Sequence, residues 1–84
     1  SEDEPVQVTV RYFAAFREAT GFETETVDTG APSTGALFEE CRQRHPGLVA
    51  WDASLVAIND EMVQWDSPFS DGDEVLFFPP VAGG

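Results

Sequence analysis

The chain has 84 residues, enough for one domain, and it carries 16 acidic residues against four arginines and no lysine, a formal net charge of −12. This charge excludes proteins that bind nucleic acid or an anionic membrane surface, because phosphate groups would repel the chain. The apolar fraction of 42%, with 12% aromatic residues, predicts a folded domain rather than acidic disorder.

The first part of the chain predicts two strands around a short helical turn. Residues 1–5 are acidic and are expected to form a disordered start. Apolar and polar residues alternate over 6–12 and again over 22–27, which is typical of strands with one buried face. Residues 13–19 predict a helical turn that ends at Gly21, since glycine readily adopts the conformation of a helix C-terminal cap. The two strands are therefore expected to form an open hairpin.

The second part predicts one main helix and three strands. The helix covers residues 35–45, with Ser33 or Thr34 as its N-terminal cap and the Pro-Gly pair at 46–47 as its end. The strands are an apolar strand, a short return strand and a central strand that is apolar on both faces: 55–58, 62–65 and 74–78.

This order of elements, β-β-α-β-β-β, predicts an α+β fold in which one main helix packs across a mixed sheet. About 80 residues in this order fit a β-grasp, ubiquitin-like domain. We expect that domain to cover residues 6–79, followed by a flexible tail over 80–84.

Residues that could support catalysis or bind a metal are scarce. The single histidine, His45, precedes a proline at a helix end, where we expect it to stabilise the helix or bond to a loop. Cys41 lies on the apolar side of the same helix and is expected to be buried and unreactive. The acidic turn at 71–74 lacks the twelve-residue pattern of a calcium loop. We therefore expect no metal site and no catalysis by this chain alone.

The C-terminus differs from the rest of the chain, because residues 75–84 have no charged side chain. A pair of prolines at 79–80 stiffens the chain, and residues 80–84 can reach about 16 Å at most. Gly83 and Gly84 have no Cβ, so they can enter a passage too narrow for other residues. The carboxylate of the last glycine is sterically open to activation. The alternative is a frayed tail that merely ends in glycine.

The segment 70–84, SDGDEVLFFPPVAGG, closely resembles the C-terminus of the small subunits of molybdopterin synthase. Residues 10–21, 45–48 and 57–59 are also similar to that family, so the resemblance covers nearly the whole chain. It implies that a ubiquitin-activating-type enzyme uses ATP to adenylate the carboxylate of Gly84. Sulfur supplied by a sulfurtransferase then replaces an oxygen of this carboxylate to give a thiocarboxylate. The thiocarboxylate delivers the sulfur to cyclic pyranopterin monophosphate.

The resemblance also implies that the chain is a non-catalytic carrier that binds no cofactor stably. It would pair with a large subunit in an assembly of two large and two small subunits, with Gly83 allowing the tail to enter the partner's active site. An aromatic and proline-rich surface suits such an interface. Strand alternation buries about half of these residues, and Phe13 and Phe78 are expected to be the exposed ones. The interface candidates are Phe13, Phe77, Phe78, Pro79, Pro80, Val81 and Ala82.

Three alternatives remain open from the sequence. A ubiquitin-like modifier would be conjugated through Gly84 to target lysines, as in small archaeal modifiers. A thiamine-thiazole sulfur carrier would share the fold but usually lacks the FFPPVA segment, and a ubiquitin-like binding module would need no terminal chemistry.

The cellular setting is predicted from what the sequence lacks. No secretory leader or membrane-spanning stretch is visible, so a cytoplasmic protein is expected. The acidic, lysine-free composition fits either simple solubility or a high-salt source.

Overall fold

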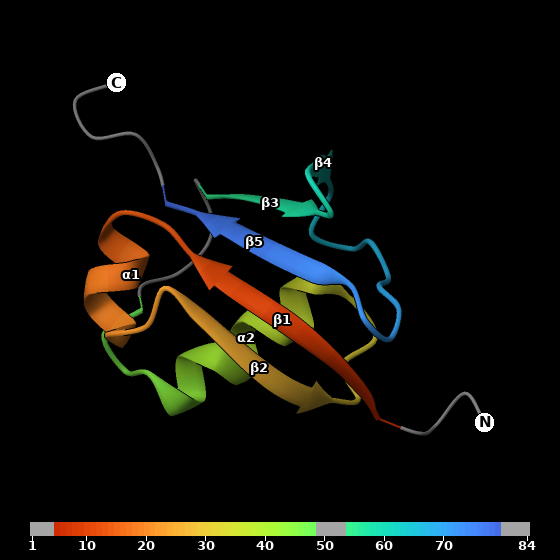
Figure 1. Cartoon of the computed structure of the whole chain (residues 1–84), viewed down its shortest axis with the longest axis horizontal. Helices are drawn as coiled ribbons and strands as arrows, with labels where there is room; N and C mark the ends of the chain where they lie inside the picture. Colours follow the sequence, from red (N-terminus) through yellow and green to blue (C-terminus); the bar gives the residue numbers. More distant parts are fainter. Residues whose placement is uncertain (1–4, 49–53, 80–84) are drawn as a thin grey trace.

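The computed structural model describes residues 5–48 and 54–79 of the chain. Within these residues, five strands form one mixed sheet in the order β2-β1-β5-β3-β4 (Figure 1). The elements in chain order are β1 (Val6–Tyr12), α1 (Ala15–Thr20), β2 (Thr24–Thr29), α2 (Thr34–Arg44), β3 (Leu55–Ile58), β4 (Glu61–Val63) and β5 (Glu74–Phe78). This arrangement confirms the predicted β-grasp fold, with α2 as its main helix.

The sheet is mixed because β5 lies between β1 and β3. Strand β1 pairs antiparallel with β2, which confirms the predicted hairpin, and parallel with β5, so that Tyr12 lies opposite Phe77. Strand β3 pairs antiparallel with β5, with Leu55 opposite Phe78. The position of β5 between two partners confirms that it is a central strand.

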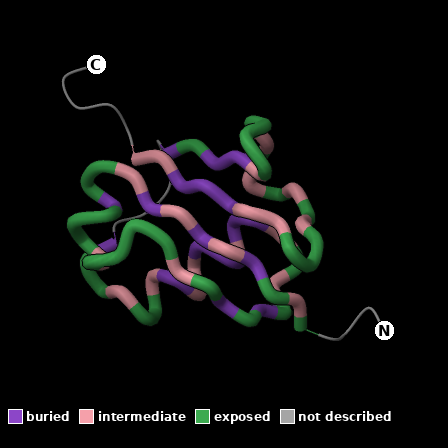
Figure 2. The backbone as a smooth tube through the Cα atoms, viewed as in Figure 1, coloured by how far each residue is buried: buried purple, intermediate pink, exposed green. Residues whose placement is uncertain are grey.

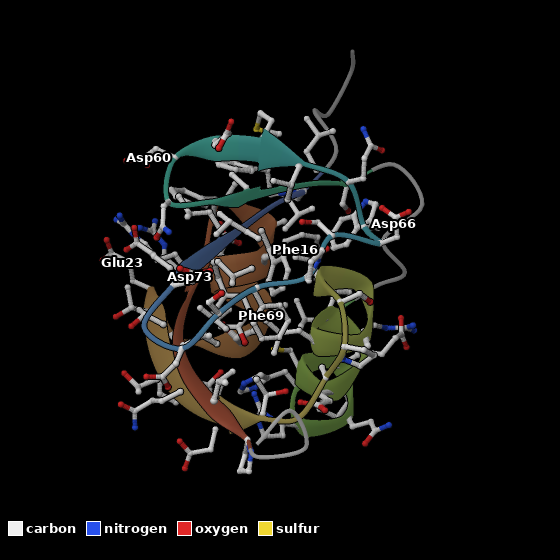
Figure 3. The ribbon with its side chains drawn as sticks, turned by 90° about the vertical axis from the view of Figure 1, so that its right-hand side faces the viewer. Phe16, Glu23, Asp60, Asp66, Phe69 and Asp73 are labelled. Carbon is white, nitrogen blue, oxygen red and sulfur yellow. The ribbon has the colours of Figure 1, made fainter. Side chains whose placement is uncertain are left out.

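The core lies between the sheet and α2, which crosses one face of the sheet (Figures 1 and 3). Buried and more exposed residues alternate along β1, as expected for a strand with one face in the core (Figure 2). Helix α2 contributes Leu37, Phe38 and Cys41, each with 0% exposure. In Figure 3, Phe16 and Phe69 lie in this interior region; Phe16 is buried, and Phe69 packs against the core as a partly buried residue.

The caps of both helices follow from the sequence. Gly21 ends α1 in the left-handed conformation, with φ 81°, and donates its N–H to the Arg17 carbonyl. At the start of α2, the Ser33 side chain accepts a hydrogen bond from the Ala36 N–H at 3.3 Å. His45 is the C-terminal cap of α2 rather than its last residue.

The bounds of two strands were predicted incorrectly: the strands expected at 22–27 and 62–65 are Thr24–Thr29 and Glu61–Val63 in the structure. Strand β2 begins at Thr24 rather than at Phe22, because the Thr20 hydroxyl bonds to the N–H and the carbonyl of Phe22 and holds that residue in a loop. Strand β4 ends at Val63, because Trp65 turns toward the core and stacks on Phe77 at a centroid distance of 5.9 Å.

The predicted disordered start, apart from Pro5, and the predicted flexible tail over 80–84 lie outside the described residues. Within residues 5–48 and 54–79, no helix has the length and apolarity needed to cross a membrane.

Candidate functional site

The predicted interface residues of β5 point to opposite faces of the sheet. Phe77 has 0% exposure and packs in the core against Phe38, at a centroid distance of 4.8 Å. Its assignment to a partner interface was therefore wrong, because strand alternation turns its side chain toward α2. Phe78 is on the other face and is half-buried, as the alternation predicted.

Phe13 and Phe78 form a stacked pair on this outer face. Their ring centroids are 4.6 Å apart and their planes differ by 13°. Phe13 directly follows β1 and Phe78 ends β5, so the pair lies where the two parallel strands end. The Arg11 guanidinium lies 5.5 Å from the centroid of the Phe13 ring. The structure thus brings together the two aromatic residues that were expected to be exposed.

Two exposed apolar residues extend this surface across the sheet. Leu55 is 58% exposed and pairs directly with Phe78 across β3 and β5, and Met62 is 54% exposed on β4. Met62 pairs with Ala57, which in turn pairs with Leu76; both of these are buried under the surface. We call the surface formed by Phe13, Leu55, Met62 and Phe78 the docking patch.

Leu55 and Met62 were not identified from the sequence. Each was placed in a predicted strand, but the face that each residue occupies depends on the pairing between strands. If the pairing of β3 with β5 had been assumed, Leu55 could have been placed opposite Phe78 and therefore on the same exposed face. An exposed apolar surface of this kind is typical of a protein interface.

Charged residues border the docking patch on the β1 side. The Arg11 guanidinium lies 3.6 Å from a Glu74 carboxylate oxygen and 3.8 Å from one of Glu23. These pairs are partly exposed to solvent, so they contribute little to folding stability. These charged groups therefore mark the edge of the apolar surface on the β1 side.

The C-terminal tail begins beside the docking patch. Pro79 is half-buried and directly follows Phe78. The remaining tail candidates, Pro80, Val81, Ala82, Gly83 and Gly84, lie outside the described residues. The five residues from 80 to 84 can span at most about 16–18 Å when fully extended.

His45 and Glu25 form a polar pair at the same end of the sheet. The His45 Nε2 atom lies 3.1 Å from Glu25 Oε1, and the Tyr12 hydroxyl donates to the same oxygen at 2.8 Å. Partial burial acts to raise the pKa of Glu25, but the hydrogen bonds from Tyr12 and His45 and the charges of His45 and Arg44 outweigh it and lower that pKa. This pair ties α2 to β1 and β2. His45 therefore has a structural role, but its partner lies on strand β2 and not on a loop, as one of the expected roles had it.

Cys41 has the properties of a structural thiol. It has 0% exposure, and burial raises the pKa of the thiol. The burial of Cys41 is as predicted, and a buried thiol in its neutral form is a poor nucleophile. Among the described residues, no group of three or more His, Cys, Asp or Glu side chains could hold a metal ion.

Comparison with known proteins gives consistent matches along the chain. A model of the ThiS family matches residues 10–84. The molybdopterin synthase sulfur carrier subunit of Escherichia coli is 38% identical over 92% of this chain and 99% of its own length. The subunit of the same description from Homo sapiens is 34% identical over 93% of this chain and 94% of its own length.

Solved structures of similar fold include a modifier protein and a subunit of a two-subunit complex. Small archaeal modifier protein 1 of Haloferax volcanii is 27% identical, with a TM-score of 0.79 over 90% of this chain and 99% of its own. A chain in the complex of subunits 1 and 2 of the molybdopterin-converting factor of Helicobacter pylori is 28% identical. Its TM-score is 0.63, over 94% of this chain and 100% of its own.

Proposed function

The chain belongs to the ThiS family, and its relatives include sulfur carrier subunits of molybdopterin synthase; from this premise we propose that the Gly84 carboxylate is the group that carries sulfur. The chain would supply no catalytic group of its own. It would present its C-terminus first to an activating enzyme and then to a large synthase subunit.

The chemistry requires activation of the Gly84 carboxylate, because a carboxylate is a poor acyl donor. Its oxygen attacks the α-phosphate of ATP on the activating enzyme, giving an acyl adenylate and pyrophosphate. The persulfide of a sulfurtransferase then displaces AMP and forms an acyl disulfide. A thiol cleaves the S–S bond of this acyl disulfide, which leaves a thiocarboxylate on Gly84 and a disulfide as the oxidised product. The thiocarboxylate delivers its sulfur to cyclic pyranopterin monophosphate, and hydrolysis of the acyl group restores the carboxylate.

The observation that carries the proposal is that β5, which leads into the tail, ends in the docking patch. Only Pro79 separates the uncharged tail, residues 80–84, from Phe78, which stacks on Phe13 in the patch. A large subunit that covers the patch would therefore be within reach of Gly84. The Helicobacter pylori chain of similar fold comes from a complex with its second subunit, which supports a partner of this kind. We propose two large and two small subunits for the full assembly.

Two variants test the parts of the proposal separately. Deleting Gly84 should abolish sulfur transfer while the fold and the affinity for the large subunit remain unchanged, because the patch is intact. Phe78→Asp should weaken binding to the large subunit but leave the folded chain with a complete tail. Normal sulfur transfer by the chain that lacks Gly84 would contradict the proposal.

A second candidate function is protein modification through the same glycine. The similarity to an archaeal modifier protein favours it. The chain has no lysine, so it could not form lysine-linked polymers of itself, although it could be joined to other proteins. Conjugates that survive denaturation, formed in its source cells and absent when Gly84 is deleted, would support this role. If conjugates appear without any thiocarboxylate, the modifier role would replace the carrier role.

A further inference from the structure

A second candidate site lies at the N-terminal end of α2, away from the docking patch. It is a shallow cleft of about 400 Å³, largely open to solvent, between the first turns of α2 and the loop that follows β4. Figure 3 shows Asp66 on this loop, on the side of the sheet that α2 covers. The cleft is lined by Ser33, Gly35, Ala36, Glu39, Trp65 and Asp66.

The backbone around the cleft is held in place by hydrogen bonds between α2 and the loop. The Gly35 N–H donates to the Trp65 carbonyl at 2.8 Å, and the Thr34 N–H donates to the Ser67 carbonyl at 2.9 Å. A Cβ at position 35 would lie 3.0 Å from the Trp65 carbonyl oxygen, so glycine allows this close approach. The cleft is therefore largely formed before any ligand arrives, which lowers the entropic cost of binding.

The cleft offers hydrogen-bond acceptors but no free backbone donors from the start of α2. The first four N–H groups, at residues 34–37, already donate to Ser67, Trp65 and Ser33 oxygens. An anion would therefore find none of the free backbone N–H groups that usually bind anions at a helix N-terminus. The two charged side chains that line the cleft, Glu39 and Asp66, are both acidic. The charges of the lining therefore favour a cationic ligand over an anionic one.

Asp66 is the carboxylate available to such a cation. The Glu39 carboxylate already accepts two hydrogen bonds from Arg42, at 3.0 and 3.1 Å. Asp66 is exposed and has no ion pair or hydrogen bond among the described residues. Most of the remaining surface of the cleft is apolar, with Trp65, Ala36 and Gly35 contributing to it. An apolar wall next to a free carboxylate matches the methylene stem and charged end of a long basic side chain.

We propose that this cleft binds an arginine or lysine side chain presented by a partner protein, with Asp66 as its acceptor. The guanidinium or ammonium group would pair with Asp66, and the methylene groups would lie against Trp65. The net charge of −12 also favours a basic partner, because it attracts positively charged proteins to the chain. This inference goes beyond the carrier role, which needs only the patch and the tail.

The position of the cleft allows it to be used while the tail is engaged. The C-terminal cap of α2, His45, packs against Tyr12, with ring centroids 5.9 Å apart. Tyr12 pairs with Phe77, so the C-terminal end of α2 lies at the end of the sheet where the tail begins. The N-terminal end of α2, with the cleft, therefore lies toward the opposite end (Figure 1). A partner bound here would leave the docking patch uncovered.

The test uses the full chain and a small probe, so it does not depend on the carrier role. N-acetyl-arginine amide is titrated into ¹⁵N-labelled protein, and amide and indole shifts are followed by NMR. The neutral, nearly isosteric N-acetyl-citrulline amide serves as the control ligand. We expect saturable shifts at Gly35, Ala36, Asp66 and the Trp65 indole with arginine amide, and much smaller shifts with citrulline amide.

A matched pair of variants distinguishes binding at Asp66 from a general attraction of arginine amide to the negatively charged chain. Asp66→Asn should weaken arginine-amide binding about threefold, the effect of losing one exposed ion pair. Asp60→Asn removes the same charge from an exposed turn and should leave the binding unchanged; asparagine tolerates the φ of 73° found there. Equal effects of the two variants, or shifts spread over all acidic turns, would overturn the proposal.

Discussion

Phe13 and Phe78 stack face to face, with ring centroids 4.6 Å apart, at the ends of two parallel neighbouring strands. The strand that ends at Phe78 continues directly into the uncharged tail, and the strand before Phe13 supplies Tyr12 to the core. The docking patch therefore lies next to the core residue Tyr12 and next to the point where the chain continues into the tail.

Replacing Phe78 by alanine should weaken the complex with the large subunit. Loss of a half-buried aromatic anchor costs about 2 kcal/mol in a typical interface, which is about thirtyfold in Kd. Isothermal titration calorimetry with purified large subunit measures this change. Phe22→Ala is the control, since Phe22 is also exposed (47%) but lies in the α1–β2 loop, outside the patch. Similar losses from both variants would show that the patch has no special role.

Replacing Phe77 by alanine should instead destabilise the fold. Phe77 is fully buried and packs against Tyr12, Phe38 and Trp65, so its removal leaves a cavity. The expected loss is about 3–5 kcal/mol in the free energy of unfolding, measured by urea denaturation. A loss below about 1 kcal/mol would mean that Phe77 is not a core residue.

The contrast between these two phenylalanines shows how far the sequence alone can lead. Alternation predicted that one of them fills the core, and the Gly21 and Ser33 caps were identified from residue types alone. The exposure of Leu55 and Met62 could not be predicted, because it depends on which strands pair and in which register. The start of β2 was missed because the Thr20 hydroxyl, a local competitor for backbone groups, keeps Phe22 out of the strand.

The Glu25 carboxylate should make stability depend on acid pH. Its pKa is lowered in the folded chain, so its contribution to stability is present above the pKa of the unfolded chain, about 4.3, and is lost as the pH falls through the folded pKa. Glu25→Gln should lower the free energy of unfolding at pH 7 by about 1–2 kcal/mol.

The same variant should lose less stability than the wild-type protein between about pH 5 and pH 3, because it lacks the carboxylate that becomes protonated. Urea denaturation at several pH values measures the difference. Parallel pH profiles for the two proteins would contradict this role of Glu25.

The charge of the chain should make its stability depend on salt. With 16 acidic residues and four arginines, the folded chain repels itself, and salt screens that repulsion. The Tm should therefore rise between 0.1 and 1 M sodium chloride, as measured by circular dichroism with both samples at pH 7. A Tm that falls or stays constant would show that the ion pairs of Arg11 and Arg42 outweigh the net repulsion.

The most direct test of the account is the intact mass of the chain after incubation with ATP, an activating enzyme and a sulfur source. We expect a product in which one oxygen is replaced by one sulfur, with fragmentation locating the change at Gly84. The chain without Gly84 serves as the control and should keep its mass. An unchanged mass for the complete chain, under conditions in which the Escherichia coli relative gains sulfur, would contradict the central claim.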